Sequence, residues 1–438
     1  MSEFPGYKGT TLQALKKIGA EIGDIIHITK GKEIYEGVLI PRSEYGDDKH
    51  VIIKLKSGYN IGVLITPMTQ IKKIGEGVKP AFSPPSLPKQ ESGLPKVAII
   101  STGGTIASRV DYRTGGVRPA LSASDLYSVV PELSKIAIID TEILFSLFSE
   151  NITARHWSEI AKSIAKHIEK GVNGVVIAHG TDTMAYTSAA LSFALQDLPV
   201  PIIMVGSQRS ADRPSSDAAT NLIGAVTAAA HAPFAEVAVA MHETISDKSI
   251  IFHRGTKVRK CHTSRRDTFE SVNASPIARI ENGQIQMLTE NYHERNSARK
   301  AVVKPDFDEK VALIKFHPNL NPQIIDWYIS ERYRGIVLEG TGLGHVGNYC
   351  LESIRKAIEK DVIVAMASQC IWGRIDMNVY DQGRDLLVVG VIPLEDMLAE
   401  TALVKLMWIF GQTKKVDEAK KLLIENMANE ISPRTLPR

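Results

Sequence analysis

Short apolar runs separated by turn residues fill the first part of the chain. They are rich in Ile and Val and lie at residues 25–29, 34–40, 50–55, 60–65 and 70–74. Several short strands at this spacing are typical of a small barrel. We therefore predict a small all-β barrel domain over residues 1–78, followed by a proline-rich, semi-rigid linker over residues 79–95.

The pattern changes near residue 96, where apolar strands begin to alternate with helical stretches. Strands are predicted at residues 97–101, 135–139, 174–178, 201–205 and 236–240, and helices at 157–169 and 183–196. This alternation predicts a parallel sheet whose strands are joined by right-handed crossovers. We assign it to an N-terminal α/β domain over residues 96–295.

A second, smaller α/β unit follows a polar stretch. Residues 296–311 have the composition of a linker, and the smaller domain is predicted over residues 312–438. Its strands are expected near residues 311–316, 335–338, 362–366 and 386–391, and its last helices at 394–409 and 416–427. The predicted fold class is therefore α/β, with a two-domain parallel-sheet body preceded by a small all-β barrel domain.

Composition and charge narrow the classes of protein to which this chain can belong. The 438 residues are enough for two or three domains, and 44% hydrophobic with 23% charged residues is an ordinary balance for a soluble protein. A net charge of +3 gives no general attraction to polyanions. Three scattered cysteines favour a reducing compartment, and the chain shows neither a signal peptide nor an apolar run that could span a membrane. We therefore expect a cytoplasmic protein with no membrane contact.

Two strand ends carry the most informative residues. The segment 179–183, His-Gly-Thr-Asp-Thr, and the segment 101–105, Ser-Thr-Gly-Gly-Thr, each follow a short apolar run. In open α/β sheets, ligands bind at the carboxyl ends of the strands. If the two strands are neighbours, the hydroxyl groups of Thr105 and Thr181 face one pocket. Taken singly, each segment also fits a tight turn or a helix cap, and the glycine turn matches neither the dinucleotide-binding nor the P-loop pattern.

Together, these segments resemble the signatures of the bacterial-type L-asparaginase family. Residues 102–107, Thr-Gly-Gly-Thr-Ile-Ala, are similar to its first signature and residues 179–183 to its second. Further similar stretches lie at residues 204–209 and 376–390, so that the resemblance covers roughly residues 96–410. A small β-barrel ahead of an asparaginase-like body, with residues 54–62 in the barrel, is similar to the glutaminase subunits of archaeal tRNA-dependent amidotransferases.

The resemblance implies a threonine nucleophile and a supporting group beside it. Thr105 would attack the side-chain amide of glutamine to give an acyl-enzyme and ammonia, and water would then release glutamate. A threonine hydroxyl is a weak nucleophile unless a base lies beside it. Thr181, Asp182 and Lys260 would provide this second group, with Lys260 as the base and Thr181 as the relay.

The same resemblance implies a set of substrate-binding groups. Asp182 would also bind the α-ammonium group of the substrate and Ser149 its α-carboxylate, with Glu150 in the same loop. The backbone N–H groups of Thr105 and Ser207 would stabilise the oxyanion. Gly104 would belong to the same substrate-binding turn.

Alternatives remain open for the role of the lid tyrosine and for the identity of the catalytic base. Residues 109–118 resemble the mobile lid of the family, in which Tyr112 either polarises the nucleophile or is an exposed loop residue. Lys260 is preferred as the base because it lies eight residues before Thr268, which anchors the similarity. Lys257 is a competitor, and a solvated basic loop is the plain alternative to both.

The family also implies a contribution from the smaller domain. In this family the active site is completed across a dimer, and residues 339–345 and 369–374 are the stretches expected there. Ordinary turns at strand ends are the alternative for both. The 12 histidines show no metal-ligand spacing, so no metal is expected in this chain.

Three functions compete on this evidence. The first is a glutaminase subunit, without a cofactor of its own, that passes ammonia to a kinase and transamidase partner. That partner would convert Glu-tRNA(Gln) to Gln-tRNA(Gln) with ATP and Mg²⁺ and would provide most of the tRNA contacts, and a homodimer within a heterotetramer is expected. The second is a free-standing cytosolic L-asparaginase, and the third is a docking protein with a vestigial site. The β domain favours the first, because a catabolic enzyme has no need of it.

Overall fold

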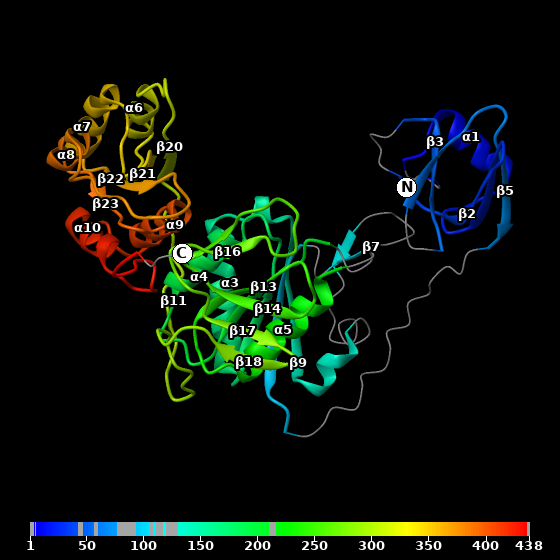
Figure 1. Ribbon diagram of the computed structural model, residues 1–438, viewed down its shortest axis with the longest axis horizontal. Helices are drawn as coiled ribbons and strands as arrows, with labels where there is room; N and C mark the ends of the chain where they lie inside the picture. The colour runs from blue at the N-terminus through cyan, green and yellow to red at the C-terminus, as the bar shows by residue number, and fades with distance from the viewer. Residues whose placement is uncertain are drawn as a thin grey trace.

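The computed structural model describes residues 4, 6–42, 47–56, 60–76, 93–104, 108–110, 117–119, 130–209 and 216–435. These residues form three folded units, which follow one another along the chain (Figure 1). A small all-β unit comes first, then a larger and a smaller α/β unit. Within the described ranges, no helix is both long and apolar enough to cross a membrane.

The N-terminal unit is a five-stranded antiparallel sheet with the order β4-β3-β2-β1-β5 and one helix. Its elements are α1 (Gly9–Lys17), β1 (Ile25–Lys30), β2 (Glu33–Leu39), β3 (His50–Lys54), β4 (Asn60–Leu64) and β5 (Gln70–Gly75). Alternate residues are buried in β3 and in most of β1, and Ile26, Ile28, Val51 and Ile53 contribute to the core. This period of two is the reason why these segments form strands. The predicted all-β domain is confirmed, and the structure adds α1.

The larger α/β unit is built on an eight-stranded sheet with the order β18-β17-β14-β13-β12-β10-β6-β9. Its strands are β6 (Lys96–Gly103), β9 (Ile138–Leu147), β10 (Gly174–Ala178), β12 (Ile202–Val205), β13 (Val237–His242), β14 (Ser249–Arg254), β17 (Ala278–Glu281) and β18 (Gln284–Met287). The neighbours β9, β6, β10, β12 and β13 are parallel, as predicted, whereas β14, β17 and β18 extend the sheet in antiparallel fashion. This extension was not predicted from the sequence.

Helices cover both faces of the larger sheet. α3 (Ala154–Glu169) and α4 (Met184–Ala194) share a core with Val175 and Ile177 of β10, and α5 (Ala218–His231) shares one with Val176 and Ala178. Successive residues of a strand face opposite sides, so β10 is buried on both faces. This explains why its sequence is a continuous apolar run.

Short elements complete the larger unit. They are β7 (Ser108–Val110) with β8 (Val117–Pro119), β11 (Leu195–Gln196) with β19 (Val302–Val303), and β15 (Val258–Lys260) with β16 (Phe269–Ser271). The strand expected at residues 135–139 is wrong in its position. Pro131–Lys135 forms a 3₁₀ helix and β9 begins only at Ile138. Proline has a fixed φ and no N–H, which suits the first turn of a helix.

The smaller α/β unit has a four-stranded parallel sheet with the order β20-β21-β22-β23. Its elements are β20 (Val311–Lys315), α6 (Gln323–Ser330), β21 (Gly335–Gly340), α7 (Leu351–Glu359), β22 (Ile363–Ser368), α8 (Asp381–Val389), β23 (Ile392–Pro393), α9 (Ala399–Gln412) and α10 (Val416–Ile424). The strand expected at residues 386–391 is wrong, because most of it belongs to α8. That helix buries Leu386, leaves Val388 85% exposed and ends at Gly390, whose φ is positive.

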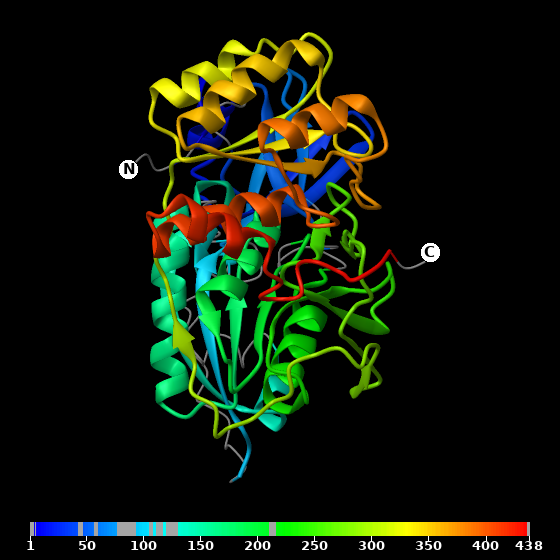
Figure 2. The ribbon, with the colours of Figure 1, turned by 90° about the vertical axis from the view of Figure 1, so that its left-hand side faces the viewer.

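Helix α9 connects the two α/β units. It packs against α4 of the larger unit and against β20 and β21 of the smaller one. Trp408 of α9 is buried and stacks on Phe193 of α4, with ring centroids 6.0 Å apart. Figure 2 shows this helix between the two sheets. One apolar core therefore spans both units.

Candidate active site

The two threonine motifs lie on neighbouring strands. β6 and β10 pair in parallel with Ser101 opposite Ala178, and the Thr102 hydroxyl donates a hydrogen bond to the Ala178 carbonyl oxygen at 3.0 Å. The adjacency on which the predicted pocket depends is therefore present. It places the segments that follow both strands at the same edge of the sheet.

The glycine turns beyond these strands are in contact. Gly104 has a φ of +82°, a conformation that favours glycine, and a Cβ atom there would lie only 2.6 Å from the backbone nitrogen of Gly180. A larger residue at position 104 would force the two motifs apart. Thr105 follows directly in the chain but lies outside the described residues, as does Tyr112 of the expected lid.

Thr181, Asp182 and Lys260 come together at this edge. The Lys260 ammonium group donates hydrogen bonds to Thr181 Oγ1 at 2.9 Å and to Asp182 Oδ1 at 2.8 Å. Thr181 is 8% exposed, whereas 69% of the Asp182 side chain remains accessible. A hydroxyl that accepts one hydrogen bond keeps its own proton to donate. The cluster therefore offers a cation, a hydroxyl donor and an open carboxylate to a molecule at the strand ends.

Lys257, the competing lysine, has a different partner. Its ammonium group is fully buried and lies 2.8 Å from Asp396 Oδ2 of the smaller unit. The loop after Lys260 is basic, but Arg265 pairs with Asp267 and Arg266 with Asp247. Of the two lysines, Lys260 is thus the one that contacts Thr181.

The segment of Ser149 also adjoins the second motif. Ser149 begins a 3₁₀ helix just after β9 and is 4% exposed, and its backbone carbonyl accepts a hydrogen bond from the Thr183 hydroxyl at 2.7 Å. A Cβ atom on Gly180 would lie 2.9 Å from Ser149 Oγ. Ser149 therefore borders the cluster, whereas Glu150 is exposed in the same helical turn.

Ser207 lies at the end of the next strand, β12. It is 3% exposed, and a Cβ atom on the preceding Gly206 would lie 2.8 Å from Thr181 Cγ2. The strands β6, β10 and β12 are consecutive in the sheet. Their ends thus bring Gly104, Thr181 and Ser207 to one edge, as the resemblance requires.

His179 supports the second motif from its buried side. It is fully buried; its Nε2 atom lies 3.0 Å from the Thr187 hydroxyl and its Nδ1 atom 2.6 Å from the Gly180 carbonyl oxygen. Thr187 accepts a hydrogen bond from Trp157 Nε1, so it can donate to the imidazole, which assigns the proton to Nδ1. Burial lowers the pKa of His179 to about 4. A neutral imidazole therefore orients the turn that carries Thr181.

Sequence reasoning missed a buried polar chain that supports the Ser207 turn. Asp217 accepts hydrogen bonds from the backbone N–H groups of Gln208 and Arg209, and Asn221 donates one to the Gly206 carbonyl at 3.0 Å. His242 Nδ1 lies 2.6 Å from Asn221 Oδ1. The signal available in the sequence is the spacing of four between Asp217, which precedes α5, and Asn221 in the first turn of that helix.

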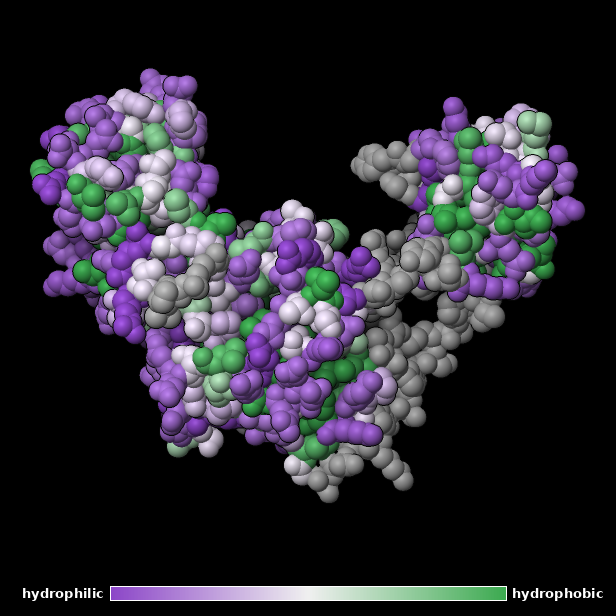
Figure 3. Space-filling model, in the orientation of Figure 1, coloured by the Kyte–Doolittle hydropathy of each residue, from purple (hydrophilic) through white to green (hydrophobic). Residues whose placement is uncertain are grey.

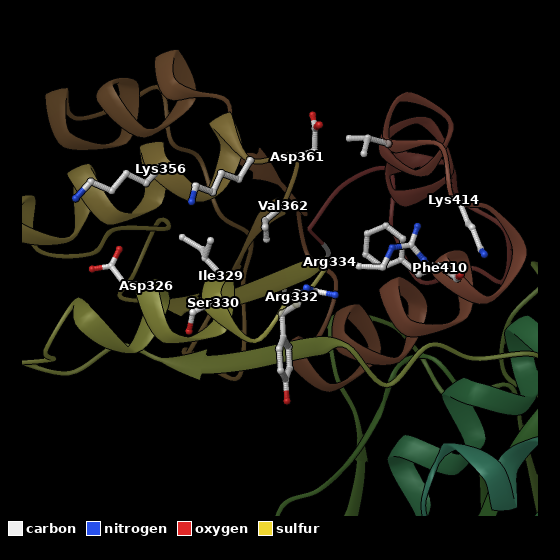
Figure 4. A pocket seen from close by; sticks show the side chains of 13 residues that line it. Asp326, Ile329, Ser330, Arg332, Arg334, Lys356, Asp361, Val362, Phe410 and Lys414 are labelled. Carbon is white, nitrogen blue, oxygen red and sulfur yellow. Dashed lines mark hydrogen bonds between the residues drawn. The ribbon is translucent and has the colours of Figure 1, made fainter.

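A cavity of about 640 Å³ lies elsewhere, in the smaller unit. Figure 4 shows Lys356 at one end of it and Lys414 at the other, with Arg334 beside Phe410. Arg334 bonds to Asp308 and to the Phe410 carbonyl, and Lys356 lies in the last turn of α7, where a cation stabilises the helix dipole. Arg334 and Lys356 thus have structural roles, and the cavity contains none of the predicted site residues.

The donor groups of the cluster are not those of a metal centre. Within the part of the chain that the structure describes, no group of three or more His, Cys, Asp or Glu side chains is arranged to hold a metal ion. The polar cluster at Lys260 consists of a cation, a hydroxyl and a single carboxylate. Its chemistry is that of proton transfer and hydrogen bonding.

Three family descriptions match this chain. Residues 20–74 match "GatD N-terminal domain", residues 96–293 match "Asparaginase, N-terminal", and residues 310–423 match "Glutaminase/Asparaginase C-terminal domain". Among solved structures, the thermostable L-asparaginase from Thermococcus kodakarensis is similar with a TM-score of 0.71 and 32% identity. The match covers 77% of this chain and 100% of that one. The part outside it corresponds in size to the N-terminal β unit and the linker.

Curated relatives match over nearly the whole chain. The GatD subunit of glutamyl-tRNA(Gln) amidotransferase from Thermofilum pendens is 46% identical, with 98% of this chain and 97% of that protein covered. The protein of the same name from Pyrococcus furiosus is 49% identical, with 97% and 98% covered. This likeness includes the β unit that the asparaginase structure lacks. The chain therefore belongs to the GatD family of glutamyl-tRNA(Gln) amidotransferase subunits, whose body has the asparaginase fold.

Proposed function

We propose that this chain is the glutaminase subunit of a tRNA-dependent amidotransferase. It hydrolyses glutamine to glutamate and ammonia and supplies the ammonia to a partner subunit, which converts Glu-tRNA(Gln) to Gln-tRNA(Gln). The observation that carries this proposal is the contact of Lys260 with Thr181 and Asp182, at the strand edge where Gly104 meets Gly180. Membership of the GatD family supports the tRNA-linked role.

Thr105 is the proposed nucleophile. Its hydroxyl oxygen bonds to the carboxamide carbon of glutamine while its proton passes to Thr181 Oγ1 and the Thr181 proton passes to Lys260, which reacts as the neutral amine. The C–N bond then breaks as this proton is returned to the nitrogen, which leaves as ammonia. Water hydrolyses the resulting ester and releases glutamate, which restores the threonine. The 2.9 Å contact between Lys260 and Thr181 supports this relay.

Substrate recognition is proposed for the groups around the cluster. Asp182, with most of its carboxylate open, receives the α-ammonium group, and Ser149 receives the α-carboxylate, with Glu150 in the same loop. The backbone N–H groups of Thr105 and Ser207 stabilise the oxyanion, each by about 3 kcal/mol.

Two further groups complete the proposed pocket. Gly104 keeps the binding turn against the second motif, because a side chain there would collide with the backbone of Gly180. Tyr112 belongs to the lid that closes over the substrate, and we propose that it polarises the nucleophile.

The remaining roles are proposed for the assembly. The partner is the kinase and transamidase component of the complex, which uses ATP and Mg²⁺ and makes most of the contacts with Glu-tRNA(Gln), while the chain described here needs no cofactor. We propose a homodimer within a heterotetramer in the cytoplasm, by analogy with the asparaginase fold and with the names of the relatives. In the dimer, residues 339–345 and 369–374 of the smaller unit complete the active site of the second copy.

The amide donor tests this proposal directly. In the complex with the partner subunit, Thr105→Ala is expected to abolish glutamine-dependent amidation of Glu-tRNA(Gln), because no acyl-enzyme forms. Amidation with ammonium chloride should remain, because it bypasses the glutaminase. Loss of both activities would assign Thr105 a structural role, and asparagine hydrolysis without any effect of tRNA would favour a free-standing asparaginase.

The N-terminal β unit is proposed to dock the partner. Residues 1–80 carry 12 Lys and Arg against 9 Asp and Glu, and this excess of positive charge is too small for strong binding to RNA. Its surface includes the apolar side chains of Ile34, Met68 and Ile74, and Figure 3 shows apolar groups on this unit. Deletion of residues 1–78 should weaken association with the partner on a sizing column more than it lowers basal glutamine hydrolysis, and an unchanged complex would contradict this role.

A further inference from the structure

Lys260 is carried by a two-stranded ribbon, β15 with β16. The start of this ribbon is bonded to β14 of the larger sheet, because the Lys257 N–H donates to the Arg254 carbonyl at 3.0 Å. At the same point the segments that carry the two strands are joined by a hydrogen bond of 2.7 Å from the Val272 N–H to the Lys257 carbonyl. Lys260 pairs with Phe269 further along. The position of Lys257 thus determines where the ribbon starts. It also determines where Lys260 lies, which is three residues, or about 10 Å, further along the strand.

The side chain of Lys257 crosses to the smaller unit. Its ammonium group donates to Asp396 Oδ2 at 2.8 Å and to the Asp396 carbonyl at 3.2 Å, and the side chains of both residues are at most 1% exposed. Asp396 Oδ1 accepts a further hydrogen bond from the Ser432 N–H at 2.9 Å. Removing one member of such a pair leaves a buried charge without its partner, which is strongly unfavourable. The pair therefore holds one fixed geometry between the two units.

Neighbouring contacts connect the ribbon to the same loops. Asn273, just after β16, exchanges hydrogen bonds of 2.9 Å with the backbone of Gly373 in both directions. Arg259 pairs with Glu400 in the first turn of α9 at 3.2 Å. Thr401 donates to the Thr256 carbonyl at 2.9 Å. The open end of the ribbon is thus bonded to the smaller unit from both of its strands.

We propose that Lys257 and Asp396 are positioning residues for the glutaminase reaction, which place Lys260 against Thr181 through the ribbon. This inference depends on the proposed function only for the reaction in which Lys260 takes part; the positioning itself is argued from the contacts. Neither residue contacts the substrate cluster, so both act through Lys260. The smaller unit of the same chain thereby determines the geometry of the base in the larger unit. An error of about 1 Å in such a geometry costs roughly 100-fold in rate.

The chain contains a matched control for the pair. Lys405 and Glu430 form a second ion pair at 2.6 Å in which both side chains are fully buried. Burial lowers the pKa of both Lys257 and Lys405. Lys405 lies on α9 and Glu430 in the C-terminal segment, and their further hydrogen-bond partners lie on α10 and in residues 425–428 rather than on the ribbon.

The test compares two double variants of the full-length chain in complex with its partner. K257M/D396N and K405M/E430Q remove the charges of one pair each and keep an acceptor oxygen for the backbone N–H groups. We expect comparable losses of Tm, because the two pairs are equally buried. For glutamine hydrolysis, kcat should fall about 10- to 100-fold in K257M/D396N with KM changed less than about threefold, and kcat should stay within about twofold in K405M/E430Q. An equal effect on kcat in both variants would overturn the inference.

A second measurement does not depend on activity. Competitive labelling with acetic anhydride, followed by mass spectrometry, reports the reactivity of the Lys260 amine, which is 14% exposed and bonded to Thr181 and Asp182. Its labelling rate should rise several-fold in K257M/D396N and stay unchanged in K405M/E430Q. Unchanged labelling in both variants would overturn the positioning role even if kcat falls. If the wild-type chain releases no ammonia from glutamine, the proposed function fails, and the labelling result alone decides on the positioning of Lys260.

Discussion

The two α/β units each contain a set of parallel strands, and the carboxyl edges of these two sets differ in one respect. At the edge of the larger sheet, Thr181 and Asp182 face a lysine from a separate ribbon, and the carboxylate stays open to solvent. At the edge of the smaller sheet, polar groups bond within their own unit: Glu339 pairs with Lys315 at 2.8 Å, and the Ser368 hydroxyl donates to the Gly342 carbonyl at 2.8 Å. The cluster at the first edge thus leaves a carboxylate accessible, whereas Glu339 and Ser368 at the second edge are bonded to neighbours in their own unit.

This difference shows that the architecture alone does not make a site. Side chains from distant segments reach both edges, but Lys260 meets the open carboxylate of Asp182 at the larger edge, whereas Lys257 meets the buried Asp396 after β23 of the smaller sheet. A function must be argued from such side chains rather than from the fold. The two edges should therefore tolerate different changes, and three changes test this expectation.

Thr181→Val should give the largest effect. It removes the oxygen that Lys260 contacts at 2.9 Å, with little change in side-chain volume. Loss of a proton-transfer group typically costs 10²- to 10⁴-fold, so we expect kcat for glutamine hydrolysis to fall by at least about 100-fold. Thr181→Ser, which keeps the hydroxyl, should retain most of the activity. Similar losses in both variants would contradict the relay, because they would show that any change to the Thr181 side chain disrupts the site, whether or not the hydroxyl is kept.

Acidification should destabilise the larger unit through its buried histidines. Burial lowers the pKa of His179 to about 4 and that of His253 to about 3, and both residues lie in the larger unit. The unfolded chain therefore binds more protons than the folded chain below about pH 6.5, so stability is complete above that pH and decreases as the pH falls toward 4. For His179 alone the loss amounts to about 3 kcal/mol.

Urea unfolding at pH 7, 5.5 and 4.5 measures this loss. His253→Asn serves as the comparison, because it removes one of the two imidazoles while an amide can still reach the Ser271 hydroxyl that His253 contacts at 2.8 Å. The decrease in stability between pH 7 and 4.5 should be smaller in this variant. A wild-type chain with equal stability at all three pH values would contradict the interpretation.

The elements of the site that are local can be predicted from the sequence. The glycine turns after β6 and β10 follow from apolar runs and turn residues, and their place at one edge of a parallel sheet follows from the βαβ alternation, whereas the pairing of the two strands is seen only in the structure. The choice between Lys257 and Lys260 does not follow in the same way. It depends on the pairing of a short ribbon and on a contact with Asp396, which is 139 residues away in sequence. No periodicity over a short window contains that information.

The errors have the same origin. Residues 386–391 are apolar enough for a strand, but tertiary packing selects helix α8, which buries only one side. The antiparallel strands β17 and β18 are only four residues long each, and no residue of β18 is fully buried, so they give a weak pattern. The hydrogen bonds that connect Asp217, Asn221 and His242 join a helix to a strand. The spacing in the sequence therefore reveals only the contact between Asp217 and Asn221.

Ser368→Ala should give the smallest effect. The Ser368 hydroxyl bonds to the Gly342 carbonyl and accepts from the Cys370 N–H at 3.1 Å, so its loss should cost about 1 kcal/mol of stability. We expect kcat to stay within about threefold, because this hydroxyl serves its own turn. Thermal unfolding and glutamine hydrolysis, measured beside Thr181→Val, check both values. A loss above tenfold with an unchanged Tm would contradict this expectation and would show that the Ser368 hydroxyl itself takes part in the site that residues 339–345 and 369–374 are proposed to complete in the second copy.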